Sequence, residues 1–184
     1  MEGMELAPSS SGPGVVDASE AAPAGAEVLF AVESFADVWP EAEPLTRPHW
    51  KEIAKNKRLL TLNPDLEKYE RLDAGGHLLP VTARADGKLI GYFLWIIIAH
   101  PHYKHVQAAE EDLHFLSPEY RSGGRYGRDR GYGFELLKAA RDAAIARGAR
   151  LLAMREKVGH EHPALLGALG FVPTDIVHTY VVKE

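Results

Sequence analysis

The stretch Arg128-Asp129-Arg130-Gly131-Tyr132-Gly133, followed at once by residues 134–140 (FELLKAA), decides the fold because it places two glycines where a loop becomes a helix. Backbone N–H groups in the first turn of a helix lack intrahelical partners, the macrodipole adds partial positive charge, and glycine lets an anion approach the main chain. Residues 108–117 (AAEEDLHFLS) indicate a preceding strand, and further arginines crowd the turn. The sequence of strand, glycine-arginine turn and helix predicts a phosphate-binding unit.

Two common phosphate-binding motifs are excluded by spacing. A P-loop needs Gly-x-x-x-x-Gly-Lys followed by Ser or Thr, and the chain contains no Lys-Ser or Lys-Thr pair. A dinucleotide fingerprint needs Gly-x-Gly-x-x-Gly, which the glycines at 123, 124, 127, 131 and 133 do not form. What remains is the pattern Arg-x-x-Gly-x-Gly, formed by Arg128, Gly131 and Gly133.

This pattern resembles the acyl-CoA pyrophosphate loop of the GNAT N-acetyltransferase superfamily, and three further segments support the resemblance. Residues 116–121 (LSPEYR) look like the strand end and turn that lead into that loop, and residues 168–171 (ALGF) are similar to the family's late helix-to-strand signature. Residues 86–92 (DGKLIGY) are similar to the hairpin that enters its third strand. The match covers roughly residues 45 to 184, and short GNAT-like proteins of tailed phages and prophages look most similar. Residues 123–127 form an insertion relative to the family pattern.

The resemblance implies an α/β (α+β) fold with a mixed, mostly antiparallel central sheet of six to seven strands flanked by helices. It also implies that acetyl-CoA is the co-substrate and enters where two central strands splay apart. An amine would attack the thioester directly in a ternary complex, without a covalent enzyme intermediate. The residues expected to bind acetyl-CoA are Leu116, Arg121, Arg125, Arg128, Arg130, Gly131, Tyr132 and Gly133.

The candidate general bases are Glu110, Glu111 and Asp112, because the family places a carboxylate on the strand that leads to the loop. Alternation along a regular strand puts Glu110 and Asp112 on one side and Glu111 on the other, unless a bulge intervenes. We favour Glu111 as the base. The alternative interpretation is that these acids are solvated charges at a strand end.

The candidate general acids are histidines. The family uses a tyrosine near its late helix, but this chain has no tyrosine between Tyr132 and Tyr180. His160 and His162 occupy that segment, and an imidazolium can protonate a thiolate near neutral pH. Tyr180 is the reserve candidate, with packing as its alternative role.

The loop after the longest apolar run carries His102, Tyr103 and His105, which the resemblance places beside the acceptor cleft. Neither this cluster nor His160-Glu161-His162 has the spacing of a helical zinc motif, so we expect no metal. Acids at 110–112 favour a cationic acceptor, such as a polyamine, an aminoglycoside-like compound or a protein lysine.

Composition is typical of a single-domain enzyme. The 184 residues include 46% hydrophobic ones and no cysteine, which excludes disulfides and a cysteine nucleophile. Residues 1–26 read as a disordered tail without signal-peptide features, and residues 27–184 as one domain. The apolar run 91–99 is too short to span a bilayer. We therefore expect a cytoplasmic protein (in the host cytoplasm if phage-encoded), either a monomer or a homodimer.

The expected elements are helices at 46–57, 63–72, 131–147 and 162–169, strands at 77–85, 88–99, 107–117 and 150–157, and a last strand or hairpin at 171–183. Two other functions stay open. The chain could be a catalytically weak acyl-CoA-binding or regulatory protein that acts through macromolecular partners. Nucleic-acid binding through the arginine loop is disfavoured, because the net charge is −5.

Overall fold

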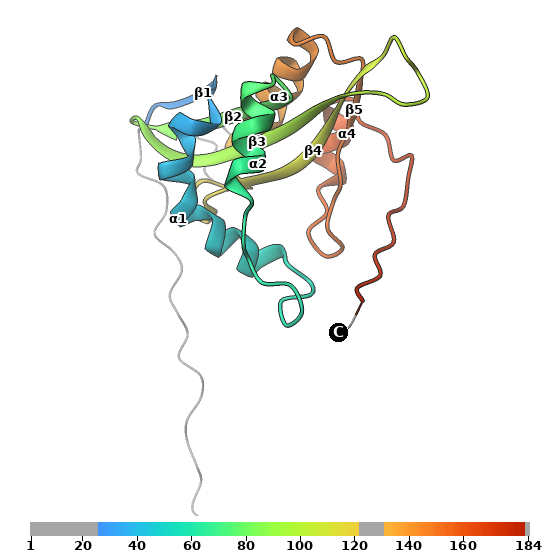
Figure 1. Ribbon diagram of the computed structural model, residues 1–184. Helices are drawn as coiled ribbons and strands as arrows, with labels where there is room; N and C mark the ends of the chain where they lie inside the picture. Colours follow the sequence, from blue (N-terminus) through green and yellow to red (C-terminus); the bar gives the residue numbers. More distant parts are fainter. Residues whose placement is uncertain (1–25, 122–130, 183–184) are drawn as a thin grey trace, which may run out of the picture.

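The computed structural model describes residues 26–121 and 131–182, so nearly all of the tail expected over residues 1–26 lies outside the described residues. Figure 1 shows the arrangement of the elements. In chain order they are β1 (Val28–Val32), α1 (Phe35–Ile53), α2 (Leu66–Ala74), β2 (Leu78–Ala85), β3 (Lys88–Ala99), β4 (Gln107–Leu116), the 3-10 turn η1 (Pro118–Tyr120), α3 (Gly131–Ala146), β5 (Leu151–Ala153) and α4 (Pro163–Ala168).

The described strands form one mixed sheet in the order β1-β2-β3-β4-β5. All neighbouring pairs are antiparallel except β4 and β5, which run parallel on either side of the connection through α3. This confirms a mixed, mostly antiparallel sheet flanked by helices. The expected count of six to seven strands is not met, because the sheet has five strands in the described part of the chain.

The expected last strand at 171–183 is wrong over its described part, residues 171–182, which hold no strand. Its β-branched residues favoured a strand, but such residues stabilise one only by pairing and packing on a sheet. Here Val172, Ile176 and Val182 are exposed. The preceding strand is also shorter than expected, because β5 covers only Leu151–Ala153.

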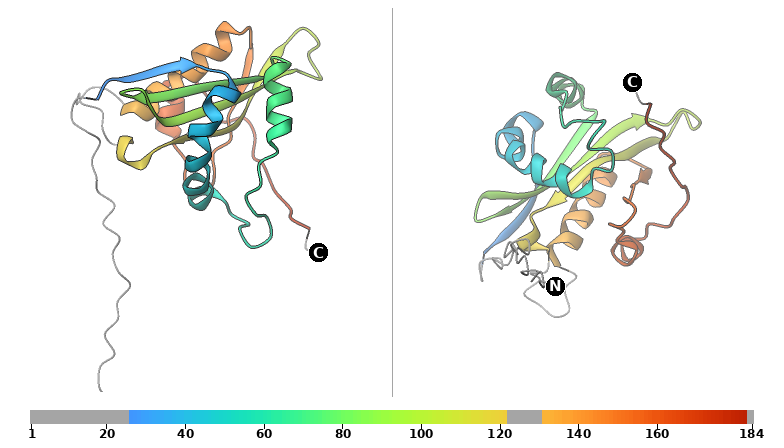
Figure 2. Two further views of the ribbon diagram at one scale, coloured as in Figure 1. Left: turned by 60° about the vertical axis from the view of Figure 1, so that its left-hand side comes forward. Right: turned by 90° about the horizontal axis from the view of Figure 1, so that it is seen from below.

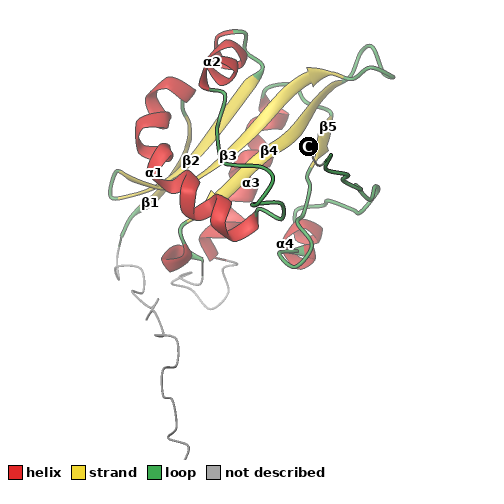
Figure 3. Ribbon diagram, turned by 60° about the horizontal axis from the view of Figure 1, so that its bottom comes forward, coloured by secondary structure: helices red, strands yellow, loops and turns green. Residues whose placement is uncertain are grey.

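Helices cover both faces of the sheet. Helices α1 and α2 pack on one face, against β2 and β3, whereas α3 packs on the other face against β1, β2 and β3. Helix α4 lies on the same side of the sheet as α3, and its Leu165 and Leu166 pack against the hydrophobic core between the sheet and α3. The right-hand view of Figure 2 and Figure 3 show these two layers with the sheet between them.

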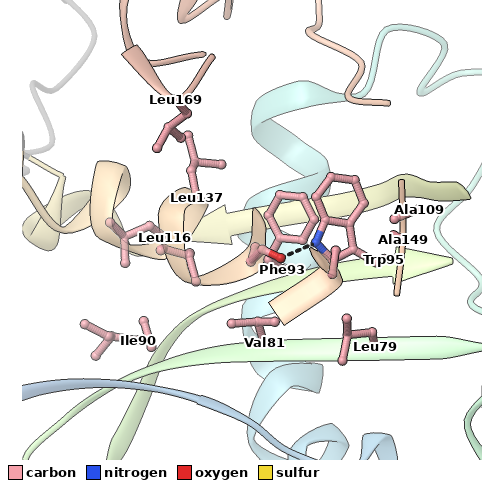
Figure 4. Close-up of a cluster of buried hydrophobic side chains, with 14 of the residues drawn as sticks. Leu79, Val81, Ile90, Phe93, Trp95, Ala109, Leu116, Leu137, Ala149 and Leu169 are labelled. Carbon is pink, nitrogen blue, oxygen red and sulfur yellow. Dashed lines mark hydrogen bonds between the residues drawn. The ribbon is translucent and has the colours of Figure 1, made fainter. Parts of the chain in front are cut away.

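The main core lies between the sheet and α3. Trp95 of β3 is fully buried, and its indole Nε1 donates a hydrogen bond of 2.8 Å to the carbonyl of Ala140 in α3 (Figure 4). The Phe93 and Trp95 rings lie 4.5 Å apart between centroids. Burying an aromatic side chain with its polar handle satisfied stabilises the fold and fixes the position of α3 on the sheet.

The hairpin between β2 and β3 is confirmed. Asp86 and Gly87 both have positive φ angles, of 48° and 83°, which is the backbone of a two-residue type I′ turn. The turn fixes the register of β3, whose bounds are the expected ones.

Helix α1 begins eleven residues before its expected start at Thr46. Three internal prolines, Pro40, Pro44 and Pro48, argue against a helix because each removes a backbone donor. The start is nevertheless well capped, since the Ser34 hydroxyl accepts from the Asp37 N–H at 3.2 Å. Burial of Phe35, Val38 and Ala42 then adds tertiary packing that outweighs the lost hydrogen bonds.

Candidate active site

A β-bulge in β4 organises the site. Trp95 of β3 is opposite Glu111 and Leu94 is opposite Leu113, so Asp112 is an extra residue with no partner in β3. As alternation predicts, Glu111 lies on the α3 side, whereas Asp112 contacts α2. Beyond the bulge, the alternation is reset, so that His114 faces the same side as Glu111 although the two are three residues apart.

Glu111 is buried and fully engaged. The residue is only 7% exposed. The Oε1 atom lies 2.6 Å from His114 Nδ1, and Oε2 accepts the Arg155 backbone N–H at 2.7 Å. A carboxylate that orients an imidazole is the arrangement found where a histidine exchanges protons with a substrate.

The neighbouring acid Glu110 is held elsewhere. Its Oε2 accepts from Arg155 Nη2 at 2.7 Å, an ion pair on the partly exposed edge of the sheet. Asp112 is bound from the other side, because the Tyr69 hydroxyl donates to its Oδ2 at 2.6 Å. Burial raises the pKa of the Tyr69 phenol, and Asp112 raises it further, so Tyr69 remains a neutral donor.

The first cleft opens where β4 and β5 separate. Their parallel pairing ends at Glu110 and Ala153. Beyond that point a cleft of about 620 Å³, which we name the strand-gap cleft, lies between β4, α3 and α4. Its lining includes Glu111, His114, Leu116, Gly133, Leu137 and Leu166.

One end of the strand-gap cleft reaches the start of α3. Gly131 has a φ of 78°, a left-handed backbone that favours glycine, and Gly133 lines the cleft beside Leu116. The Tyr132 ring lies 6.4 Å from the Tyr120 ring. The expected phosphate ligands Arg125, Arg128 and Arg130 lie outside the described residues.

Arg121 is held at the rim of the cleft by other groups of the chain. Its guanidinium donates to both carboxylate oxygens of Glu52, at 2.6 and 2.7 Å, and to the Leu116 carbonyl at 2.7 Å. The bidentate hydrogen bonds from Arg121 lower the pKa of Glu52. Arg121 therefore joins α1 to the turn after β4.

The second cleft, of about 800 Å³, lies on the other face of the sheet beside α1 and the segment 54–64, and we name it the aromatic cleft. Its lining includes Phe35, Trp39, Trp50, Tyr69, Leu62 and Leu113. The two clefts share His49, Ile53, Asp112 and Leu113 as well as residues 155–157, so they adjoin at the bulge.

His49 stands at the junction of the clefts. It is buried, its Nδ1 lies 3.0 Å from the Tyr92 hydroxyl oxygen, and its ring stacks on Phe115 with 5.1 Å between centroids. Burial, with a smaller contribution from the neighbouring His114, lowers the pKa of His49 to about 4. The imidazole is therefore neutral at physiological pH.

The structure brings together some of the sequence-predicted residues and separates others. His160 and His162 line the strand-gap cleft together with Glu111. Tyr180 lines neither cleft and is 89% exposed. His102, Tyr103 and His105 lie on the exposed β3–β4 loop and also line neither cleft. Among the described residues, no cluster of three His, Asp or Glu could hold a metal ion.

Sequence reasoning missed His49, His114 and Arg155. His49 lies four residues before Ile53 within the helix expected at 46–57, so helical periodicity could have placed both on one face. His114 and Glu111 lie on the same face of β4 only because of the bulge at Asp112, and the residue pattern of the strand does not predict this bulge. Arg155 falls in a segment expected to be strand, whereas it lies just beyond β5.

No protein-family model and no curated relative matches the chain. Solved structures do match it. A ribosomal-protein-alanine N-acetyltransferase from Brucella melitensis biovar Abortus 2308 is 18% identical over 86% of this chain and 99% of its own, with a TM-score of 0.56. An aminoglycoside acetyltransferase from an uncultured soil sample is 14% identical over 85% and 97%, with a TM-score of 0.64.

A third match is a predicted acetyltransferase from Clostridium acetobutylicum, solved with acetyl-CoA. It is 14% identical over 84% of this chain and 96% of its own, with a TM-score of 0.59. At this level of identity the likeness shows the fold, which is that of GNAT acetyltransferases. Within residues 26–121 and 131–182, no helix combines the length and apolar character needed to cross a bilayer.

Proposed function

We propose that the domain spanning residues 27–184 is an acetyl-CoA-dependent N-acetyltransferase, which moves the acetyl group to a small-molecule primary amine in a ternary complex. The observation that carries this proposal is the meeting of two clefts at the β4 bulge, beside the Glu111–His114 pair. Each of the two clefts can hold one of the two substrates. Direct transfer requires the substrates to meet, as they would where the clefts adjoin.

Acetyl-CoA is assigned to the strand-gap cleft. The first-turn N–H groups of α3 supply donors for the pyrophosphate, and Gly131 and Gly133 carry no Cβ that would keep it from the main chain. The edge of β4 beyond Glu110 has no β5 partner, so it can accept the extended pantetheine arm. Arg125, Arg128 and Arg130 complete the phosphate site in this proposal.

The Glu111–His114 pair is assigned as the proton acceptor. His114 Nε2 takes the proton that the amine loses as the new C–N bond forms, and Glu111 stabilises the resulting imidazolium through Nδ1. The C–S bond of the thioester then breaks, and the thiolate takes a proton from His160 or His162, which line the same cleft. A neutral amine and acetyl-CoA thereby give the acetylated amine and CoA thiol, and an amine that binds as its ammonium form first releases one further proton to solvent.

Isothermal titration with acetyl-CoA tests the proposal. Gly131→Glu introduces a carboxylate that obstructs and repels phosphate, and it should abolish binding. Gly87→Glu is the matched control, because Gly87 has a similar φ of 83°, lies at the β2–β3 turn and has open space around it. Both substitutions carry the same kind of backbone strain.

We expect the parent and Gly87→Glu proteins to bind acetyl-CoA, and the parent then to release CoA thiol in the presence of a primary amine. A folded parent that does not bind acetyl-CoA would refute the assignment of the strand-gap cleft. Binding without thiol release over a broad amine panel would instead favour an acyl-CoA-binding or regulatory protein.

A further inference from the structure

The walls of the aromatic cleft are apolar and partly pre-ordered. Phe35 stacks on both Trp39 and Tyr69, with ring centroids 5.5 and 5.1 Å apart. Trp50 and Leu113 add further apolar surface to the same cleft. Ligand sites that are lined in this way bind flat or aliphatic bodies by removing them from water.

The charges that line the cleft do not favour a polycation. They comprise three basic residues, Lys55, Arg155 and Lys157, and two acidic ones, Asp112 and Glu156. Glu156 already accepts the backbone N–H of His162. The acidic run at 110–112 does not form one anionic surface in this cleft. Glu110 is paired with Arg155, and Glu111 lies on the other face of β4.

Asp112 is the carboxylate best placed to bind a single ammonium group. It lies in the bulge, lines both clefts and is exposed. The Tyr69 hydroxyl fixes one of its oxygens at 2.6 Å, which orients the carboxylate at the junction where transfer would occur. An amine nitrogen near Asp112 leaves the rest of its molecule among the aromatic side chains.

We propose that the acceptor is a small monoamine with an apolar body, of the arylalkylamine class, and that it binds in the aromatic cleft with its ammonium group on Asp112. This inference rests on the proposed function. It departs from the polyamine and aminoglycoside-like acceptors that the acidic run alone had favoured. It follows from one fixed carboxylate, from basic residues that leave the cleft without an acidic surplus, and from aromatic walls.

Binding of the amine, measured by ligand-observed NMR on the full chain, tests the inference without any need for turnover. We expect 2-phenylethylamine to bind at least about tenfold more tightly than spermidine or an aminoglycoside, since one extra charge–charge repulsion or one lost apolar contact is worth about this factor. Equal or tighter binding of the polycations would overturn the inference.

Two sets of variants locate the site. Asp112→Asn should weaken binding of 2-phenylethylamine, whereas Asp142→Asn should not, because Asp142 lies on α3 and pairs with Lys138 and Arg141. The double variant Lys55→Glu/Lys157→Glu should shift preference toward spermidine. If Asp112→Asn binds 2-phenylethylamine as tightly as the parent, the assignment of its ammonium group is wrong.

A thiol-release assay with the same amines separates this inference from the proposed function. Faster release with 2-phenylethylamine than with spermidine supports both. Faster release with spermidine leaves the transferase standing and overturns the acceptor class. If 2-phenylethylamine binds in the aromatic cleft but no amine releases CoA, the transferase proposal fails while the binding class is retained.

Discussion

At the residue scale, one buried carboxylate is responsible for an imidazole's orientation. Glu111 accepts one backbone N–H and contacts His114 through its second oxygen, so its two oxygens have separate roles. A carboxylate with both oxygens engaged is poorly placed to take a proton from a substrate itself. This is why we assign proton acceptance to the pair and not to Glu111 alone.

Glu111→Gln tests that assignment. Glutamine preserves the shape and can still accept the Arg155 N–H, but it cannot stabilise an imidazolium. We expect kcat to fall by about 10²-fold or more with the dissociation constant of acetyl-CoA unchanged, as measured by steady-state kinetics and calorimetry. Glu67→Gln, on the exposed face of α2, is the control. An unchanged kcat in Glu111→Gln would remove the pair from the mechanism.

His49 makes the fold sensitive to acid. Its folded pKa, about 4, lies below the unfolded value near 6.5, so the unfolded chain binds more protons between these pH values. The stability that depends on a neutral His49 is therefore present above pH 6.5 and lost as the pH falls toward 4.

We expect His49→Gln to flatten the fall in the free energy of unfolding between pH 6.5 and 4, by up to about 3 kcal/mol. Urea denaturation at several pH values measures this, with the exposed His102→Gln as the control. A fall as steep in His49→Gln as in the parent would show that His49 does not cause it.

At the scale of elements, turn and capping residues in the sequence determined which element bounds were predicted correctly. The Asp86-Gly87 turn and the flanking apolar runs predicted β2 and β3 to within a residue, because turn chemistry and register are local. The start of α1 was missed because the three prolines within the helix argued against a helix that begins at the N-cap residue Ser34. The bulge at Asp112 depends on pairing with β3, so a pattern within β4 cannot reveal it.

The ion pair between Arg121 and Glu52 connects α1 to the turn after β4. A double-mutant cycle with Arg121→Ala and Glu52→Ala, measured by urea denaturation, should give a coupling energy of about 1 kcal/mol, because both side chains are partly exposed and solvent screens them. Arg121→Ala should cost more than Glu52→Ala, since it also removes the hydrogen bond to the Leu116 carbonyl.

Acetyl-CoA titrations of the same variants test the role expected for Arg121 in binding the co-substrate. A direct phosphate contact predicts weaker binding in Arg121→Ala and not in Glu52→Ala. Equal losses in both variants would mean that the pair acts by holding α1 in place.

At the scale of the whole molecule, long-range packing determines which residues line the two clefts, and the sequence alone predicted only part of this. The sequence predicted one site for Glu111, His160 and His162, and all three line the strand-gap cleft. The order of β4, α3 and α4 along the chain brings these segments to the same cleft. The histidines of the β3–β4 loop were assigned to the acceptor side from the resemblance alone, and the hairpin carries them away from both clefts. The aromatic cleft, which we propose as the acceptor site, is lined by aromatic residues of α1 and α2, whose shared surface becomes apparent only in the folded structure.

The shortness of β5 has a consequence for local unfolding. Only three register pairs hold β5 to β4, whereas β3 and β4 are paired over nearly their whole lengths. Detaching this edge should therefore cost less free energy than unfolding the whole domain. A molecule that seats itself against the free edge of β4 and contacts both strands would suppress that opening by mass action. The gap that we propose for acetyl-CoA is thus also an edge that should open locally without unfolding of the whole domain, and occupancy by acetyl-CoA should slow amide hydrogen exchange there.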